Sequence, residues 1–307
     1  MHARTPTSRR RGPAPHLRRV LLAASAAVLL LHAAAATDVA AAPPRDVVAA
    51  PSAVRTATTP RTATATATKH FIANLNGSTA PRALGFTVFD TGPSGVASLP
   101  AGVQGLVWLG QKCPTPADAT FRATVDRLAA SPRVFGYYLS DEPHIVDCPR
   151  GVAALASRAD YIRSRTHGAQ KSFIVLSRDV DYSAFRPSAS HVDLVGIDSY
   201  PCSTGSPSCP VTKIRDKVTA ARQAGIPVAA MVPIYQAFGQ QNISGGYYRL
   251  PTAAQLQSML AEWARLVPSP VMDYAYGWSH QSSANPTLVD SSALQRVLAT
   301  HNGVAVG

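Results

Sequence analysis

Two adjacent carboxylates follow an apolar run at Phe135–Leu139, where the sequence reads FGYYLSDEPH. The chain has only two glutamates, Glu142 and Glu262, and Glu142 stands between Asp141 and a proline. An apolar run that ends in carboxylates is typical of a buried strand that surfaces at its C-terminal end. Neighbouring carboxylates on a partly buried rim suit general acid–base chemistry, because burial and a second negative charge raise a carboxyl pKa. Glu142 is therefore the leading catalytic candidate.

Other carboxylate, amide and aromatic side chains follow further apolar runs or lie within them. Carboxylates and amides hydrogen-bond to sugar hydroxyls, and large aromatic rings pack against the flat C–H faces of sugars. Arg178 is the one basic residue at these run ends, so the set favours a poly- or oligosaccharide over an anionic ligand. Besides Asp141 and Glu142, the candidates are Asp90, Trp108, Tyr138, Asp198, Tyr200, Gln236, Tyr276 and Trp278.

Eight short apolar runs are the elements that would position these residues. Most are continuously apolar, which is typical of parallel strands covered on both faces. Amphipathic helical stretches separate them, although 77–84 and 91–102 are too short for full helices. Thr115-Pro116 and Pro251-Thr252 are expected to open helices, and Asp290 to cap the last one. The predicted strands are 70–74, 85–90, 103–109, 135–140, 172–177, 192–198, 227–235 and 271–276.

This alternation of strands and helices predicts a single (β/α)8 barrel over residues 70–307, since about 250 residues are typical of that fold. The main alternative is a doubly wound open sheet, but no glycine-rich phosphate turn follows any strand. In a barrel the C-terminal strand ends form one rim that carries the active site. The candidate side chains are therefore expected to converge there.

Several short motifs resemble secreted (β/α)8 glycoside hydrolases over residues 70–300. Asp141-Glu142-Pro143 is similar to the Asn-Glu-Pro that carries the acid/base on the fourth strand of that superfamily, and VDLVGIDSYP is similar to the sixth-strand pattern. The YGW stretch resembles the eighth strand with its aromatic platform. The chain also resembles a group of hydrolase-like barrels that combine a YYLxDEP strand, a GxDxYP strand and a QAFG segment. The resemblance implies hydrolysis of O-glycosidic bonds with Glu142 as general acid/base.

Two departures from that superfamily affect the expected mechanism. Asp141 replaces the usual asparagine, and Gln236 ends the seventh strand, where retaining enzymes keep a nucleophilic glutamate. Asp198 or Asp141 is left as the second carboxylate, with Asp90 and Asp273 as weaker options. A carboxyl separation of about 5–5.5 Å favours retention and one of about 6.5–9.5 Å inversion. Substrate-assisted catalysis, with an acetamido group oriented by Tyr200 or Gln236, would also account for a missing carboxylate.

Other interpretations of the same residues remain open. The barrel could bind a glycan without cleaving it, or act as an interaction protein of the cell envelope. Asp141-Glu142 could instead cap the following segment or pair with Arg178. A metal site of His144 with the two carboxylates is disfavoured, because only His280 adds a histidine near a strand end. There is no cofactor motif, so no cofactor or metal is expected, and the oligomeric state is not predicted.

The N-terminal region has the pattern of a secretion signal followed by a linker. Arginine pairs precede the apolar residues 20–31 and alanine-rich cleavage options, which predicts a signal peptide over residues 1–42, of the general or twin-arginine type. A membrane anchor is the alternative, but the apolar run is short for a span. Residues 43–69 are rich in Ala, Thr and Pro, which predicts a disordered linker. We therefore expect an extracellular protein with no membrane contact after signal removal.

Charge and cysteine content fit that compartment. The chain has a formal charge of +12, but residues 71–307 hold 19 Lys/Arg against 15 Asp/Glu, without the clustered basic face of a nucleic-acid binder. An even number of cysteines in a secreted chain predicts disulfides. Three pairings are possible for Cys113, Cys148, Cys202 and Cys209, and Cys202–Cys209 would close a small loop. A metal site is disfavoured because the chain has no CxxC motif.

Overall fold

The computed structural model describes residues 67–281 and 285–305 of the chain. The predicted signal peptide, residues 1–42, and positions 43–66 of the predicted linker lie outside the described residues. Within the described residues, no helix combines the length and the apolar character that a membrane span requires.

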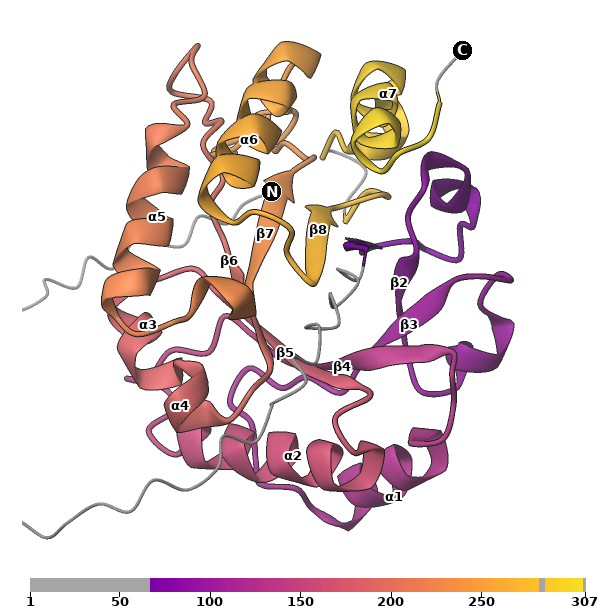
Figure 1. Ribbon diagram of the computed structural model, residues 1–307. Coiled ribbons are helices and arrows are strands. Elements are labelled where there is room, and N and C mark those ends of the chain that lie inside the picture. The colour runs from indigo at the N-terminus through magenta and orange to yellow at the C-terminus, as the bar shows by residue number, and fades with distance from the viewer. Residues whose placement is uncertain (1–66, 282–284, 306–307) are drawn as a thin grey trace, which may run out of the picture. The chain divides into compact units, whose positions relative to one another are not determined.

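The described strands form one closed barrel, which confirms the predicted (β/α)8 fold (Figure 1). Every neighbouring pair is parallel, and β1 closes the barrel by pairing with β8, His70 lying opposite Asp273. The predicted strand 85–90 begins later, at Val88, and the predicted strand 227–235 begins with a short 3-10 helix, η3 (Val228–Ala230). The strands are β1 Lys69–Ile72, β2 Val88–Thr91, β3 Gln104–Trp108, β4 Val134–Asp141, β5 Lys171–Leu176, β6 Leu194–Ile197, β7 Met231–Gln236 and β8 Met272–Tyr276.

Helices surround the barrel, as Figure 1 shows. The first two crossovers contain only short 3-10 helices, η1 (Ala80–Leu84) and η2 (Gly95–Ser98), as the short segments predict. Two helices between β5 and β6 were not predicted, because each has too few residues to show the repeating apolar spacing by which a helix is recognised in a sequence. The α-helices are α1 Ala119–Leu128, α2 Gly151–Thr166, α3 Asp179–Phe185, α4 Pro187–Ser190, α5 Thr212–Gln223, α6 Ala253–Leu266 and α7 Ser292–His301.

Helix starts follow their capping side chains. Thr252 and Gln255 form a capping box at α6, as Pro251-Thr252 predicts. The prediction for α1 is wrong, because Asp118 accepts a hydrogen bond from the Phe121 N–H and the helix begins after it. The prediction for α7 is also wrong. Ser291 caps that helix, whereas Asp290 ends the 3-10 helix η4 (Leu288–Asp290).

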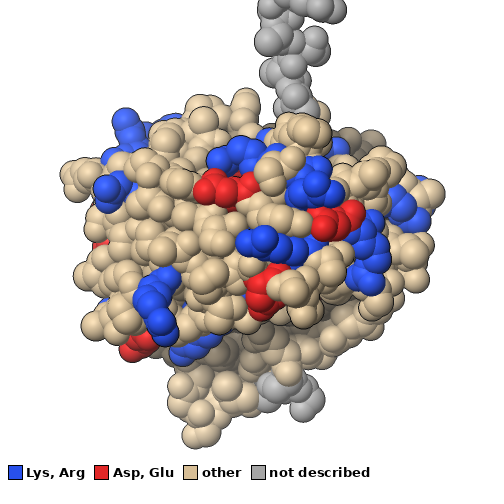
Figure 2. Space-filling view, turned by 90° about the horizontal axis from the view of Figure 1, so that it is seen from below, with Lys and Arg blue, Asp and Glu red and all other residues tan. Residues whose placement is uncertain are grey.

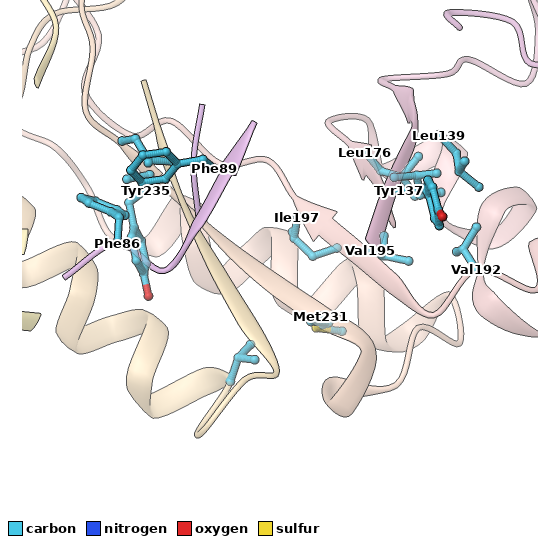
Figure 3. Close-up of a cluster of buried hydrophobic side chains, with 14 of the residues drawn as sticks. Phe86, Phe89, Tyr137, Leu139, Leu176, Val192, Val195, Ile197, Met231 and Tyr235 are labelled. Carbon is cyan, nitrogen blue, oxygen red and sulfur yellow. The ribbon is translucent and has the colours of Figure 1, made fainter. Parts of the chain in front are cut away.

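Side chains alternate between two apolar layers along each strand. One layer fills the barrel and includes Phe71, Phe173 and Tyr274. The other lies between the strands and the surrounding helices, and Figure 3 shows members of it such as Tyr137 and Ile197. Two-sided burial explains why the strands are continuously apolar in sequence. Packing on both faces holds the strands in register, and this fixes the positions of the strand ends that form the rim.

Disulfides and a buried arginine hold the loops that follow the strands. Cys113 is bonded to Cys148 and Cys202 to Cys209, which confirms the predicted disulfides and selects one of the three possible pairings. Arg158, on α2, is buried and donates to the Leu109 and Thr115 carbonyl oxygens at 3.0 and 2.7 Å.

The face in Figure 2 carries Lys and Arg interspersed with Asp and Glu rather than gathered in one patch.

Candidate active site

The strand ends enclose a cavity of about 200 Å³ at the C-terminal rim. Six of the ten predicted catalytic and substrate-binding residues line it, and neither Lys nor Arg is among the lining residues. The six are Tyr138, Asp141, Glu142, Asp198, Tyr200 and Tyr276. Five lining residues that were not predicted as site residues complete the polar and aromatic wall: Phe238, Gln240, Tyr248, Tyr274 and Gln281.

Glu142 is held in an uncommon backbone conformation at the end of β4. Its φ of 47° lies in the left-handed region, which costs a residue with a side chain about 1–2 kcal/mol. The backbone N–H of Glu142 donates to the Val175 carbonyl oxygen of β5 at 3.0 Å. Strained residues of this kind cluster at functional sites, where the surrounding structure enforces them. The half-buried Glu142 side chain faces the cavity.

Asp181 of α3 holds the segment that follows Glu142. Its buried carboxylate accepts a hydrogen bond from the Ile145 N–H at 2.9 Å and lies 3.0 Å from His144 Nδ1. Arg178 pairs with the same carboxylate at 3.7 Å, so it does not neutralise Asp141 or Glu142 as the alternative interpretation required. His144 is likewise engaged away from the cavity carboxylates. Sequence reasoning missed Asp181, because it lies on a helix rather than at a strand end.

Asp198 is the buried carboxyl group of the site. It directly follows β6, where its N–H donates to the Leu176 carbonyl oxygen at 3.0 Å. Burial raises the pKa of Asp198 well above its ordinary value, and hydrogen bonding with Glu142 and the negative charge of Glu142 raise this pKa further, while a hydrogen bond with Tyr200 opposes them. Its Oδ1 is buried and has no hydrogen-bond partner within the described residues. Asp198 therefore binds its proton more tightly than an exposed aspartate does.

Asp141 stands at the cavity mouth and is more exposed than Glu142. The Tyr138 hydroxyl donates to Asp141 Oδ1 at 2.6 Å. Desolvation raises the pKa of Asp141, the hydrogen bond from Tyr138 lowers this pKa, and the charge of Glu142 raises it. The net shift is upward, so two of the three clustered carboxyl groups bind protons more tightly than an exposed aspartate.

Aromatic rings form the opposite wall. The Tyr200 ring packs edge-on against Phe238 and Tyr248, with centroids 4.9 and 5.4 Å away, and lies nearly parallel to the Tyr276 ring at 6.2 Å. Burial raises the pKa of Tyr200 well above its ordinary value and that of Tyr248 to about 12. Their hydroxyl groups therefore stay neutral and can donate to and accept from sugar hydroxyls.

Gln236 lies behind the cavity wall and does not line it. Its side chain is fully buried, and its Nε2 donates to the carbonyl oxygens of Cys202 and Arg249 at 2.9 and 3.0 Å. Its Oε1 accepts from the Cys202 N–H at 2.9 Å. The amide therefore joins the loop after β6 to the loop after β7, and these backbone bonds occupy it instead of a substrate.

Three other predicted residues also lie outside the cavity lining. The Asp90 carboxylate accepts from the Asn74 N–H at 2.9 Å and fixes the loop after β1. Trp278 is buried in the layer outside the strands, where it cannot contact a sugar. Trp108 is 44% exposed, and its ring packs edge-on against Tyr138, which does line the cavity. Trp108 therefore offers an aromatic surface beside the site.

Asp273, the weaker option for a second carboxylate, is remote from the rim. It is the second residue of β8 and contacts His70 and His301 rather than Asp141, Glu142 or Asp198. Asp273 therefore does not belong to the carboxyl cluster of the cavity.

A second cavity of about 590 Å³ adjoins the first and shares Glu142, Asp198, Tyr200 and Tyr248 with it. It continues over Ser177 and the start of α5, and its other charged lining residues are Asp179, Lys213, Asp216 and Lys217. The shared carboxyl groups thus stand at the junction of two cavities, with room for a ligand on both sides.

Comparison with known proteins identifies the fold but no closer relative. No family model matches the chain, and no curated protein matches it. Solved structures with similar folds include a GH128 endo-β-1,3-glucanase from Amycolatopsis mediterranei bound to laminaritriose, with 14% identity, a TM-score of 0.52 and coverage of 76% of this chain and 98% of the other.

Two GH18 structures match to a similar degree. An N-acetylglucosaminidase from Paenibacillus barengoltzii has 10% identity and a TM-score of 0.52 over 76% of this chain and 99% of its own. A chitinase from Cycas revoluta, in complex with allosamidin, has 12% identity and a TM-score of 0.51 over 76% of this chain and 99% of its own. The resemblance to (β/α)8 glycoside hydrolases is thereby confirmed at the level of the fold.

Proposed function

We propose that the protein is a secreted glycoside hydrolase that cleaves O-glycosidic bonds in a poly- or oligosaccharide, with Glu142 as general acid/base. The observation that carries this proposal is the convergence of Asp141, Glu142 and Asp198 in one tyrosine-lined cavity at the C-terminal rim. Glycoside hydrolysis requires a protonated carboxyl group and a second carboxyl group beside the scissile bond. A rim of carboxylates and aromatic rings supplies both the acid and the sugar-binding surface.

Glu142 and Asp198 act as a pair in this proposal. Because burial and the charge of Glu142 raise the pKa of Asp198, the pair keeps a proton to higher pH than an exposed aspartate does. Glu142 stands at the junction of the two cavities, where a glycosidic oxygen would lie. As the glycosidic bond breaks, Glu142 donates its proton to the leaving oxygen, while a water molecule bonds to the anomeric carbon and gives its proton to the Asp141 carboxylate. Asp198 then passes a proton to Glu142, and exchange with solvent restores Asp141 and Asp198. Asp141, held by Tyr138, fixes the mouth of the site.

The charge of the lining selects the kind of sugar. The smaller cavity contains three carboxyl groups and no Lys or Arg among its lining residues. A sugar with carboxylate, sulfate or phosphate groups would meet like charge there. The part of the proposed substrate that enters the smaller cavity is therefore neutral or cationic. The names of the similar barrels make β-1,3-glucan and N-acetylglucosamine-containing chains the first polymers to try.

The proposal is tested by release of reducing sugar from a panel that includes laminarin, chitin oligosaccharides and other neutral polysaccharides. Glu142→Gln should lower kcat/KM by about 10²–10⁴-fold on any cleaved substrate, because that is the usual contribution of an acid/base group. The matched control is Glu262→Gln, the same change at the other glutamate, which lies on α6 and pairs with Arg215 and Arg265. Equal activity of the two variants would refute the assigned role.

A second candidate function is glycan binding without cleavage. It is favoured by one observation: the carboxylate expected at the end of β7 is replaced by Gln236, which bonds to backbone groups. Calorimetry on the same panel separates the two functions. Binding by both the wild-type protein and Glu142→Gln, with no reducing sugar released by either, would establish a binding barrel and exclude the hydrolase.

Secretion is part of the proposal and rests on the leader and on the disulfides. Both disulfides lie in the described part of the chain, and disulfides persist in oxidising compartments. N-terminal sequencing of protein recovered from culture medium tests it, with a start near residues 34–42 expected from the alanine-rich cleavage options. Intact leader on cell-associated protein would contradict it.

A further inference from the structure

A cluster of two histidines, a buried aspartate and a tyrosine lies away from the active-site cavity. It consists of His70 on β1, Tyr235 on β7, Asp273 on β8 and His301, the last residue of α7, and we refer to it as the seam cluster. His70 Nδ1 lies 3.0 Å from Asp273 Oδ1, and His301 Nε2 lies 2.9 Å from Asp273 Oδ2. The Tyr235 hydroxyl is 3.4 Å from Asp273 Oδ2 and also from His301 Nε2.

The seam cluster occupies the layer between the barrel and α7. Phe71, Met272 and Tyr274, which flank its strand residues in sequence, belong to the barrel interior. Side chains alternate along a strand, so His70 and Asp273 point outward, toward α7. Parallel pairing places His70 directly beside Asp273 where β1 and β8 close the barrel. The proposed hydrolase uses none of these residues.

The buried charge of Asp273 lacks a permanent cation. Its side chain is 3% exposed, and its ion pairs within the described residues are with His70 and His301. A buried carboxylate is stable when it is paired or when it coordinates a metal. No Lys or Arg of the described residues pairs with Asp273, so a divalent cation held by the same three side chains would compensate its buried charge.

The donor atoms are of the types that bind zinc and lie close together. Neutral imidazole nitrogen and carboxylate oxygen are zinc ligands, and each binds at about 2.0–2.2 Å, which sets neighbouring ligands about 3.4 Å apart in a tetrahedron. One atom from each of His70, Asp273 and His301 lies within 4.8 Å of the others. The nitrogen–oxygen contacts to Asp273 are 3.0 and 2.9 Å, so a bound ion requires only small side-chain movements.

A path from solvent leads to the cluster. The His301 side chain is 25% exposed, and it lines a cavity of about 460 Å³ between α6 and α7, together with Gln257, Arg296 and Thr300. An ion can enter through this cavity, and a water molecule can complete the coordination from the same side. Arg296 is the one permanently charged side chain in the lining.

We propose that the seam cluster binds one Zn²⁺ ion through His70, Asp273 and His301, with water as the fourth ligand. The three protein ligands come from the first strand, the last strand and the last helix of the described barrel, so the ion ties α7 to the barrel closure. Imidazole and carboxylate ligands also accept Co²⁺, which gives the site a spectroscopic probe.

The test uses the folded, chelator-treated full chain. Calorimetric titration with Zn²⁺ should show one equivalent bound, and the melting temperature should rise with zinc, because the ion binds the folded state. Co²⁺ should give the intense visible d–d absorption of a tetrahedral ion. The wild-type spectrum needs no variant and remains informative even if a ligand substitution unfolds the chain.

Variants assign the ligands. His301→Gln and His70→Gln should each weaken zinc binding by at least about 100-fold, more than loss of an outer-shell partner does. His280→Gln is the matched control, because His280 forms a surface pair with Asp290 at 2.7 Å and should leave zinc binding unchanged. Absence of zinc binding by the wild type at micromolar zinc would show a hydrogen-bonded cluster only and would overturn the proposal. Wild-type affinity in both ligand variants would overturn it as well.

Discussion

Replacing Asp198 by asparagine should make the protein more stable at neutral pH while removing the proposed hydrolase activity. Asparagine has the shape of aspartate but does not titrate, so it removes the buried acid without opening a cavity. Its amide can donate to Glu142 as the protonated carboxyl group does. The substitution therefore keeps the packing of the site and changes only the proton equilibrium, which isolates the effect of the raised pKa.

The size and sign of the effect follow from linkage. In the folded state the pKa of Asp198 is raised well above 3.8, so the folded protein holds this proton over a pH range in which the unfolded chain has released it. Folding stability then falls as pH rises through that range, by about 1.4 kcal/mol for each pH unit, until the folded pKa is reached. An asparagine at this position contributes no such slope. The stability of Asp198→Asn relative to the wild type should therefore rise by about 1.4 kcal/mol for each pH unit within that range.

The assay is chemical denaturation of both proteins from about pH 4 to about pH 8, where the free energies of unfolding are compared at each pH. Asp90 and Asp141, whose pKa values are also raised, are present in both proteins and largely cancel in the difference. A difference that is constant with pH would refute the raised pKa. So would a wild type that is more stable than Asp198→Asn at neutral pH.

Three further predictions concern the surroundings of the site. Gln236→Ala should lower the free energy of unfolding by about 3 kcal/mol, because it leaves buried backbone groups of the Cys202 loop without partners. A loss of less than about 1 kcal/mol, measured from a denaturation curve, would contradict this role. Trp108→Ala should weaken oligosaccharide binding about tenfold in calorimetry with little change in stability, since its ring is exposed; unchanged affinity would exclude it from the sugar surface. Replacing Cys113 and Cys148 by serine removes a crosslink between residues 35 positions apart in the sequence. The replacement should lower the free energy of unfolding by about 4 kcal/mol, and an unchanged denaturation midpoint would contradict this stabilising role.

The barrel was predictable because burial on both faces restricts the residues of a strand. A strand covered on both faces must be apolar at successive positions, so β4, β5 and β7 appear as continuous apolar runs. Helices of several turns leave a periodic apolar face, which identified α2 and α6. Helices α3 and α4 have too few residues to show a period, and they went unrecognised. Helix starts depend on single capping bonds, which explains the errors at Asp118 and Ser291.

The lining of the candidate cavity was predictable where a residue ends a strand and points inward. Glu142, Asp198 and Tyr276 satisfy both conditions and line the cavity. Position at a strand end does not fix the direction of the side chain, which is why Trp278 is in the outer layer instead. Tyr248 reaches the cavity from a loop after β7 that pairs with Ser203. No local pattern encodes that contact, because it depends on two loops far apart in sequence.

At the rim, carboxyl groups that lower stability lie next to loops that buried hydrogen bonds hold in place. Glu142 has a left-handed backbone, and Asp198 has a buried oxygen without a partner in the described residues, so both lower stability. The side chains that fix the surrounding loops take no part in the proposed chemistry: Gln236 bonds to backbone groups, and Asp181 anchors the chain after Glu142. Because these anchors are bonded on several sides, they hold the loops next to the carboxyl groups in place. Loosening an anchor should therefore lower the pKa of Asp198 and the proposed activity together, whereas a packing defect elsewhere in the barrel should lower stability alone.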